Sequence, residues 1–176
     1  LCFTDHMDYE YWYEPAGMFE VDVPKYFEAL LQLKEQYAGT FNVRIGIELG
    51  LRGEPDLLES VRERYRTLVN EHPFDFVIGS THQMVYVDPV YPEFWENRTQ
   101  REGMEMHFTS GLKNIKNNEF FDTYGHLDYL IRYASGDKAQ YNYRDYAELI
   151  EPMLRELIAR GKALEIFKGK LEAYLK

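Results

Sequence analysis

Apolar residues along this chain follow two different periods, and the two alternate from one end of the sequence to the other. Short runs with the composition of buried strands occur at 1–3, 43–48, 76–78 and 163–166. Between them, apolar residues recur at three- and four-residue steps, which predicts amphipathic helices at roughly 24–37, 54–70, 99–117 and 143–160. The alternation indicates an α/β fold with parallel strands and outer helices.

Two segments depart from this simple pattern. Residues 84–95 form a proline-containing aromatic stretch that is longer than an ordinary connection, which predicts a functional loop. Gly103 and Gly111 fall inside the predicted helix at 99–117 and weaken that prediction, because glycine disfavours helix interiors.

Ionisable side chains recur at the ends of the predicted strands. His6, Glu48, His82 and His126 follow one another at intervals of roughly 35–45 residues, each at the carboxyl end of a strand. In a parallel barrel these ends face one side, so the four side chains are expected to converge. Four or five strand–helix units are too few for a barrel of about eight strands, which predicts part of a barrel.

Three imidazoles and a carboxylate are a plausible metal-binding set. Imidazole suits zinc, iron and manganese, and a carboxylate can bridge two ions that together clamp a phosphoryl oxygen. Taken singly, a histidine after a strand is more often a hydrogen-bonded loop residue, and Glu48 could equally cap a helix or pair with Arg52. Four such residues at matching positions favour the metal site.

The remaining histidines and the cysteine lack this placement. His72 precedes a strand and His107 lies within a predicted helix, so both are expected to be structural. Cys2 lies in an apolar strand and is expected in the core. Asp5 is expected to orient the loop that follows the first strand.

Composition narrows the class of protein. The chain has 176 residues, 45% of them hydrophobic, which suits one domain or a large part of one. A formal net charge of −10 disfavours sequence-independent nucleic-acid binding, which requires clustered Lys and Arg. With one cysteine, and without an apolar run of about 18 residues or a signal peptide, the sequence predicts a cytoplasmic protein without membrane contact.

Four motifs, in order and at strand ends, resemble those of the PHP (polymerase and histidinol phosphatase) superfamily. They are Thr4-Asp5-His6, Gly46-Ile47-Glu48, Gly79-Ser80-Thr81-His82 and Gly125-His126-Leu127-Asp128. Longer strings resemble the bacterial histidinol-phosphatases of the PHP type in particular, at 75–82, 88–95 and 124–133. The resemblance covers about residues 1–166.

The resemblance implies a distorted (β/α)₇ TIM-like barrel with up to three zinc, iron or manganese ions. It implies that Glu48 bridges two ions, that His82 and His126 ligate beside it, and that His6 serves the third, so these four residues are both metal-ligating and catalytic. The implied reaction is hydrolysis of L-histidinol phosphate to L-histidinol and phosphate in histidine biosynthesis. Arg132 is a candidate phosphate ligand, because guanidinium binds phosphate in a bidentate manner, or else forms a salt bridge on the following helix.

The chain also departs from the family pattern. The family's first His-x-His motif and its late Asp-x-His motif are both absent, and residues 167–176 have the pattern of a Lys-rich amphipathic tail. We therefore expect a partial PHP domain at 1–166, a partial metal set and impaired activity. The alternatives are another PHP-type phosphoesterase, such as a nuclease or cyclic-phosphodiester hydrolase, and a non-catalytic truncated domain. The sequence does not indicate an oligomeric state.

Overall fold

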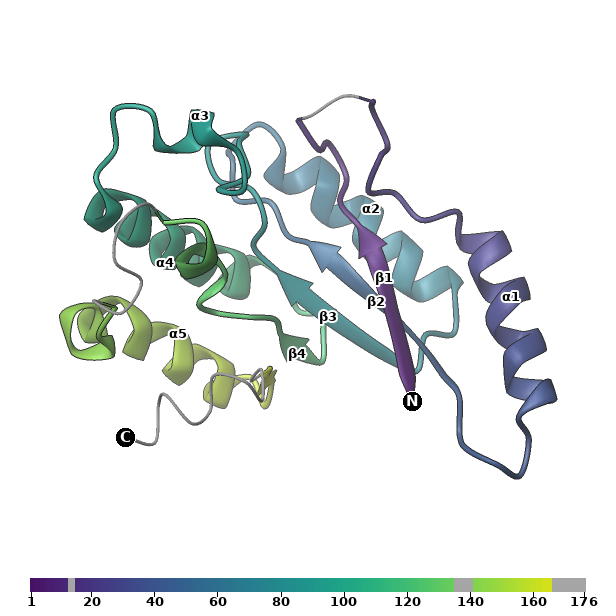
Figure 1. Cartoon of the computed structure of the whole chain (residues 1–176). Helices are drawn as coiled ribbons and strands as arrows, with labels where there is room; N and C mark the ends of the chain where they lie inside the picture. The colour runs from purple at the N-terminus through teal and green to yellow at the C-terminus, as the bar shows by residue number, and fades with distance from the viewer. Residues whose placement is uncertain (13–14, 135–140, 166–176) are drawn as a thin grey trace.

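A parallel sheet of five strands, in the order β1-β2-β3-β4-β5, lies at the centre of the molecule (Figure 1). The structure is a computed structural model and describes residues 1–12, 15–134 and 141–165. The strands are β1 (Cys2–Met7), β2 (Arg44–Gly50), β3 (Phe76–Ser80), β4 (Thr123–Tyr124) and β5 (Ala163–Leu164). Sequential order of parallel strands is the order found in (β/α) barrels, whereas doubly wound sheets reverse direction partway.

Helical segments connect the strands. They are α1 (Val23–Gln36), α2 (Leu58–Glu71), α3 (Pro92–Trp95), α4 (Gln100–Asn117) and α5 (Ala147–Ala159), with short 3₁₀ turns η1 (Tyr129–Arg132) and η3 (Tyr143–Asp145). Connections between neighbouring parallel strands are right-handed, so sequential strand order places the helices on the same face of the sheet. The predicted α/β fold with parallel strands and outer helices is confirmed.

Helix α4 forms despite its two glycines, and both have a packing reason. The Thr99 hydroxyl accepts from the Glu102 amide, and the Glu102 carboxylate accepts from the Thr99 amide, so the helix begins with a capping box. A Cβ added at Gly103 would lie 2.8 Å from the Trp95 ring, and one at Gly111 would lie 2.6 Å from Met153. The glycines therefore allow close approach to α3 and α5.

A row of core side chains follows β2, which, like β3 and β4, pairs with a strand on each side. Ile47 and Leu49 of β2 and Leu51 just after it are fully buried, and the Tyr65 ring of α2 and the Phe121 ring belong to the same cluster. Burial of each such aliphatic side chain stabilises the fold by about 1.5–3 kcal/mol. The ends of β1, β2 and β3 are thereby held against a rigid base.

Some predicted boundaries and one side chain differ from the structure. Strand β1 continues to Met7 and β2 to Gly50, because their pairing persists through His6 opposite Glu48. The expectation that Cys2 is in the core is wrong; β1 is the first strand of the described sheet, and Cys2 is exposed at its start. Ile166 and the predicted tail at 167–176 lie outside the described residues.

Among the described residues, every helix is too short or too polar to cross a bilayer.

Candidate metal centre

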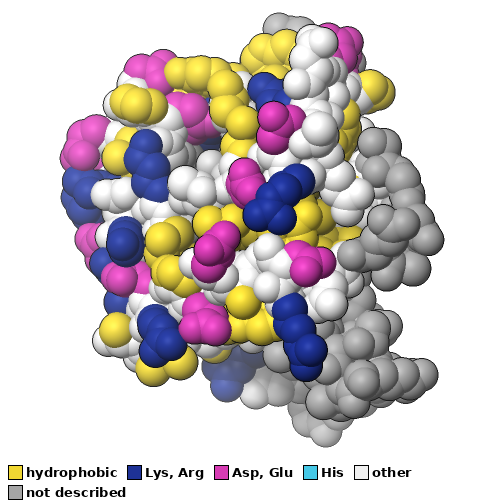
Figure 2. Space-filling model, turned by 90° about the vertical axis from the view of Figure 1, so that its left-hand side faces the viewer, with side chains coloured by type: hydrophobic (Ala, Val, Ile, Leu, Met, Phe, Trp, Pro, Cys, Tyr) yellow, Lys and Arg dark blue, Asp and Glu magenta, His cyan; other side chains and the backbone are white. Residues whose placement is uncertain are grey.

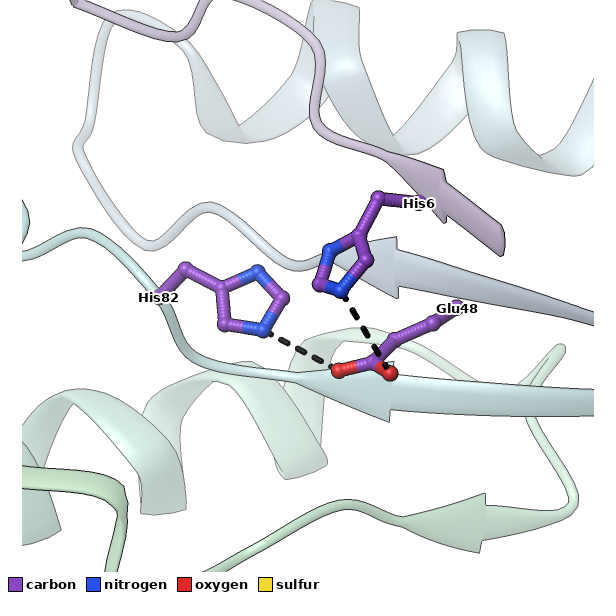
Figure 3. A group of neighbouring side chains, drawn as sticks. All are labelled: His6, Glu48 and His82. Atoms are coloured by element: carbon purple, nitrogen blue, oxygen red, sulfur yellow. Dashed lines mark hydrogen bonds and ion pairs between the residues drawn. The ribbon is translucent and has the colours of Figure 1, made fainter. Parts of the chain in front are cut away.

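The sheet brings the four predicted residues to its carboxyl edge. His6 and Glu48 are direct partners in the β1–β2 pairing, and His82 and His126 each lie two residues beyond the ends of β3 and β4. Figure 3 shows the His6, Glu48 and His82 side chains pointing toward one another from three neighbouring strand ends. Sequence separation is irrelevant to this grouping, because parallel strands carry their carboxyl ends to one edge.

Three of the side chains form a tight triangle of donor atoms. Oε1 of Glu48 lies 3.0 Å from Nε2 of His82 and 2.9 Å from Nε2 of His126, and the two nitrogens are 3.4 Å apart. Ligands about 2.0–2.2 Å from a tetrahedral zinc ion are spaced about 3.3 Å from one another. The triangle therefore has the dimensions of one face of a zinc site.

His6 approaches the other side of the same carboxylate. Its Nε2 lies 3.9 Å from Oε2 of Glu48, and ligand atoms of His6, Glu48 and His82 all fall within 4.8 Å of one another. Because the two oxygens of Glu48 face different histidines, the carboxylate is placed to bridge two ions. This donor set suits zinc, iron or manganese.

Asp8 joins the cluster, and the sequence reasoning missed it. Its Oδ1 accepts a hydrogen bond from Nδ1 of His82 at 2.6 Å, and its Oδ2 accepts one from Nδ1 of His6 at 3.1 Å. Alternate residues of a strand share a face, so the spacing from His6 was a usable signal. The sequence predicts a strand that ends at Phe3, so it does not place Asp8 beside His6.

The charges in the cluster depend on one another. Burial opposes ionisation of Glu48, yet hydrogen bonds from His126 and His82 hold its pKa well below the usual range. Burial disfavours charged His82, but the Asp8 and Glu48 carboxylates raise its pKa well above the ordinary value. The hydrogen bond to Asp8 likewise raises the pKa of His6. Without a metal ion, protons balance the two carboxylates; a cation bound at Nε2 would replace them.

Other described residues support the cluster through hydrogen bonds. Ser80 donates its hydroxyl proton to Oε1 of Glu48 at 2.8 Å. His107, buried in α4, donates from Nε2 to the Leu127 carbonyl at 2.8 Å and so fixes the loop that carries His126. Burial lowers the pKa of His107 to about 4, which keeps the ring neutral. His72 packs on Phe27 and Phe74, away from the cluster, as a structural residue does.

A cleft of about 440 Å³ opens over the cluster. Arg132, at the end of η1, lies in its wall, within a 3₁₀ turn rather than on the helix expected there. Asp88 adds a carboxyl group to the same cleft. It is 5% exposed and accepts hydrogen bonds from the hydroxyls of Tyr11 at 2.9 Å and Tyr129 at 3.0 Å. Burial raises the pKa of Asp88, although these hydrogen bonds oppose the rise.

Tyr129 connects the two parts of the cleft. Its ring centroid lies 5.0 Å from that of His126 and 5.5 Å from that of His82, while its hydroxyl bonds to Asp88. Asp88 comes from the 84–95 loop, which therefore lines part of the cleft. The two tyrosines were not predicted, because neither stands at a strand end.

The sequence is similar to those of known proteins. The PHP domain family matches residues 1–168. A curated histidinol-phosphatase of Lactococcus lactis subsp. lactis is 30% identical over 168 residues, covering 94% of this chain and 59% of the relative. A curated Clostridium acetobutylicum relative is 26% identical over 171 residues. The chain thus spans about 60% of the length of these two curated relatives.

Solved structures agree with the fold. The crystal structure of a Lactococcus lactis histidinol phosphate phosphatase, in complex with zinc, L-histidinol and phosphate, superimposes with a TM-score of 0.84 at 29% identity. The match covers 94% of this chain and 60% of that chain. A Listeria monocytogenes protein solved as a candidate histidinol phosphatase gives a TM-score of 0.74 at 13% identity, which supports the fold alone.

Proposed function

The chain belongs to the PHP domain family, and from this premise we propose that it takes part in metal-dependent hydrolysis of L-histidinol phosphate to L-histidinol and phosphate. The observation that carries the proposal is the triangle of Glu48 Oε1, His82 Nε2 and His126 Nε2, with edges of 2.9–3.4 Å. Such a set of donors at a cleft floor suits a hydrolytic metal site.

His6, Glu48, His82 and His126 would hold divalent ions, with Glu48 between them. His82 and His126 face one oxygen of Glu48, and His6 faces the other. When bound, zinc, iron or manganese acts as a Lewis acid toward a phosphoryl oxygen. We expect these four residues to be needed for catalysis.

We propose that Arg132 binds the phosphate group. It lies in the wall of the cleft that opens over the cluster. A guanidinium group donates two parallel hydrogen bonds to phosphate and carries a permanent positive charge. Together with the cluster, it would fix the phosphate and favour the negative charge that grows during hydrolysis.

The same cleft suits a substrate with a positive end. Asp88 presents a carboxylate between Tyr11 and Tyr129, and the Tyr129 ring also faces the histidines. An ammonium or imidazolium group would be attracted to the carboxylate and to the aromatic faces. L-Histidinol phosphate carries both a phosphate and an amine, whereas a nucleic-acid strand offers repeated negative charge.

The charge of the chain favours a small phosphorylated substrate over nucleic acid. Figure 2 shows the α4 and α5 side of the molecule, where basic side chains are interspersed with acidic ones. With a net charge of −10, we propose a small phosphorylated substrate, without nucleic acid or membrane as a partner, and a cytoplasmic location. Nuclease and cyclic-phosphodiesterase activities remain the competing hypotheses.

Phosphate binding and release test the proposal directly. Purified chain with added zinc or manganese is titrated with inorganic phosphate by calorimetry and assayed for phosphate release from L-histidinol phosphate, oligonucleotides and cyclic phosphodiesters. We expect phosphate to bind only with metal present, and we expect L-histidinol phosphate to be hydrolysed in preference to the other two substrates. Metal-loaded protein that neither binds phosphate nor hydrolyses L-histidinol phosphate, or that prefers oligonucleotides, would contradict it.

A further inference from the structure

We propose that Asp8 is a positioning residue that orients two metal-binding histidines at once, in a space kept open by Gly50. The inference rests on the proposed metal site, and it concerns how the apoprotein prepares that site. Three independent features of the structure support it: the bonds of the Asp8 carboxylate, the absence of a side chain at position 50, and a tyrosine that ties the two strands together.

The two oxygens of Asp8 serve different rings. Oδ1 lies 2.6 Å from Nδ1 of His82, and Oδ2 lies 3.1 Å from Nδ1 of His6. Asp8 is only 2% exposed, and its backbone amide donates to the Phe19 carbonyl at 2.8 Å, so the carboxylate has little freedom to turn away. A single side chain therefore links histidines that lie 76 residues apart in the sequence.

Gly50 makes this placement possible. Asp8 and Gly50 each follow a paired residue of β1 and β2, Met7 opposite Leu49, so they face each other at the strand ends. A Cβ built at Gly50 would lie 1.8 Å from Oδ1 of Asp8, a distance that two non-bonded atoms cannot share. Any other residue at position 50 would displace the oxygen that bonds His82.

Tyr65 holds the two strand ends in register. Its hydroxyl lies 2.9 Å from the Met7 carbonyl oxygen and 2.8 Å from that of Gly50, and it accepts from the Tyr9 amide at 3.2 Å. The ring is fully buried. The backbone on both sides of Asp8, and the glycine opposite, are thus fixed to helix α2.

The consequence is a defined tautomer at both rings. An ionised carboxylate can only accept hydrogen bonds, so Nδ1 of His6 and Nδ1 of His82 must both carry the proton. In each neutral ring the lone pair then lies on Nε2, the atom that faces Glu48. Asp8 thereby leaves Nε2 of both rings as the nitrogen that can exchange its proton for an ion, as carboxylates behind metal-bound histidines do.

Nitrogen NMR of the histidines tests this in the wild-type chain. With zinc bound at about pH 8, we expect protonated Nδ1 and metal-bound Nε2 at both His6 and His82. An unprotonated Nδ1 at either ring would overturn the inference. This measurement requires neither turnover nor a variant, so it does not depend on whether a substitution allows folding.

Two variants give a second readout, the zinc dissociation constant. In Asp8→Asn the amide group can accept from one ring only, so the other must move its proton to Nε2, and we expect zinc to bind about 10- to 100-fold more weakly. Gly50→Ala keeps every charge and should weaken zinc binding by displacing Oδ1. Asp75→Asn, which removes a carboxylate at the far end of the sheet, and Gly103→Ala, which crowds Trp95, are the matched controls.

The outcomes separate this inference from the proposed function. Zinc affinity in Asp8→Asn within about twofold of wild type, or a loss equal to that in the controls, would overturn it. Wild-type chain that binds no zinc would instead overturn the proposed metal site.

Discussion

Nε2 of His126 lies 2.9 Å from Oε1 of Glu48, although 78 residues separate the two in the chain. Both side chains are buried, and the contact spans β2 and the segment after β4. Lone pairs of a nitrogen and an oxygen repel at this distance unless a proton or a cation lies between them. The contact is therefore a place where either can be bound, and several predictions depend on it.

Removing the charge of Glu48 should cost most of the metal affinity. Glu48→Gln keeps the shape but removes the anionic ligand that faces Nε2 of the three histidines, so we expect zinc to bind more than about 100-fold more weakly. Competition with a coloured chelator measures this. Glu119→Gln, an exposed change on the far side of the fold, should leave zinc affinity unchanged. Equal affinity in both variants would show that Glu48 is not a ligand.

Because the two oxygens of Glu48 face different histidines, we expect the chain to bind two ions with different affinities. His126→Ala should remove the tighter one, because His126 and His82 complete the triangle, whereas His6→Ala should affect a weaker second ion. Calorimetry with zinc, together with elemental analysis, distinguishes them. That the chain holds a partial set of ions and turns over slowly stays a prediction for the same experiments. Loss of both ions in His6→Ala would contradict the assignment.

Arg132 should act on phosphate and not on metal. Arg132→Lys retains the charge but loses the paired hydrogen bonds, so we expect phosphate to bind the zinc-loaded chain about tenfold more weakly, with zinc affinity unchanged. Arg144→Lys, in the exposed η3 turn, is the control. Unchanged phosphate affinity in Arg132→Lys would favour the alternative of a structural salt bridge.

Asp88 should act on the positive end of the substrate. In Asp88→Asn the charge is lost, but the amide oxygen can still accept from Tyr129 and from the Val90 amide, and the amide NH2 group can donate to the Tyr11 hydroxyl, so the loop should stay in place. We expect L-histidinol to bind the metal-loaded chain about tenfold more weakly, since each tenfold change in affinity is about 1.4 kcal/mol, and phosphate to bind as before. Parallel loss of both ligands would indicate collapse of the cleft instead.

His107 should make the stability of the metal-free chain depend on pH. Its pKa is about 4 in the folded chain and about 6.5 when unfolded, so the unfolded state binds more protons between these values. Stability from this group is complete above about pH 6.5 and is lost as the pH falls toward 4. Between pH 7 and pH 5 we expect a loss of about 2 kcal/mol.

Urea unfolding at the two pH values measures this loss. His107→Gln can still donate to the Leu127 carbonyl but does not titrate, so it should show a loss smaller by about the same amount. The same pH dependence in both proteins would mean that other groups cause it.

The sequence by itself determined the alternation of strands and helices and the four residues at strand ends. Hydrophobic periodicity is a local property, and parallel strands bring their carboxyl ends to one edge whatever the loops do, so His6, Glu48, His82 and His126 could be predicted to meet. The capping box that begins α4 was equally local.

Tertiary structure alone decided which side chains support those four. Asp8 reaches His82 across 74 residues only because Gly50 leaves it room, and Tyr129 meets Asp88 only because η1 and the 84–95 loop close over the same cleft. Cys2 was misplaced for the same kind of reason: an apolar neighbourhood in the sequence does not show whether another element covers the strand. Such contacts depend on the space between distant segments, which no local pattern records.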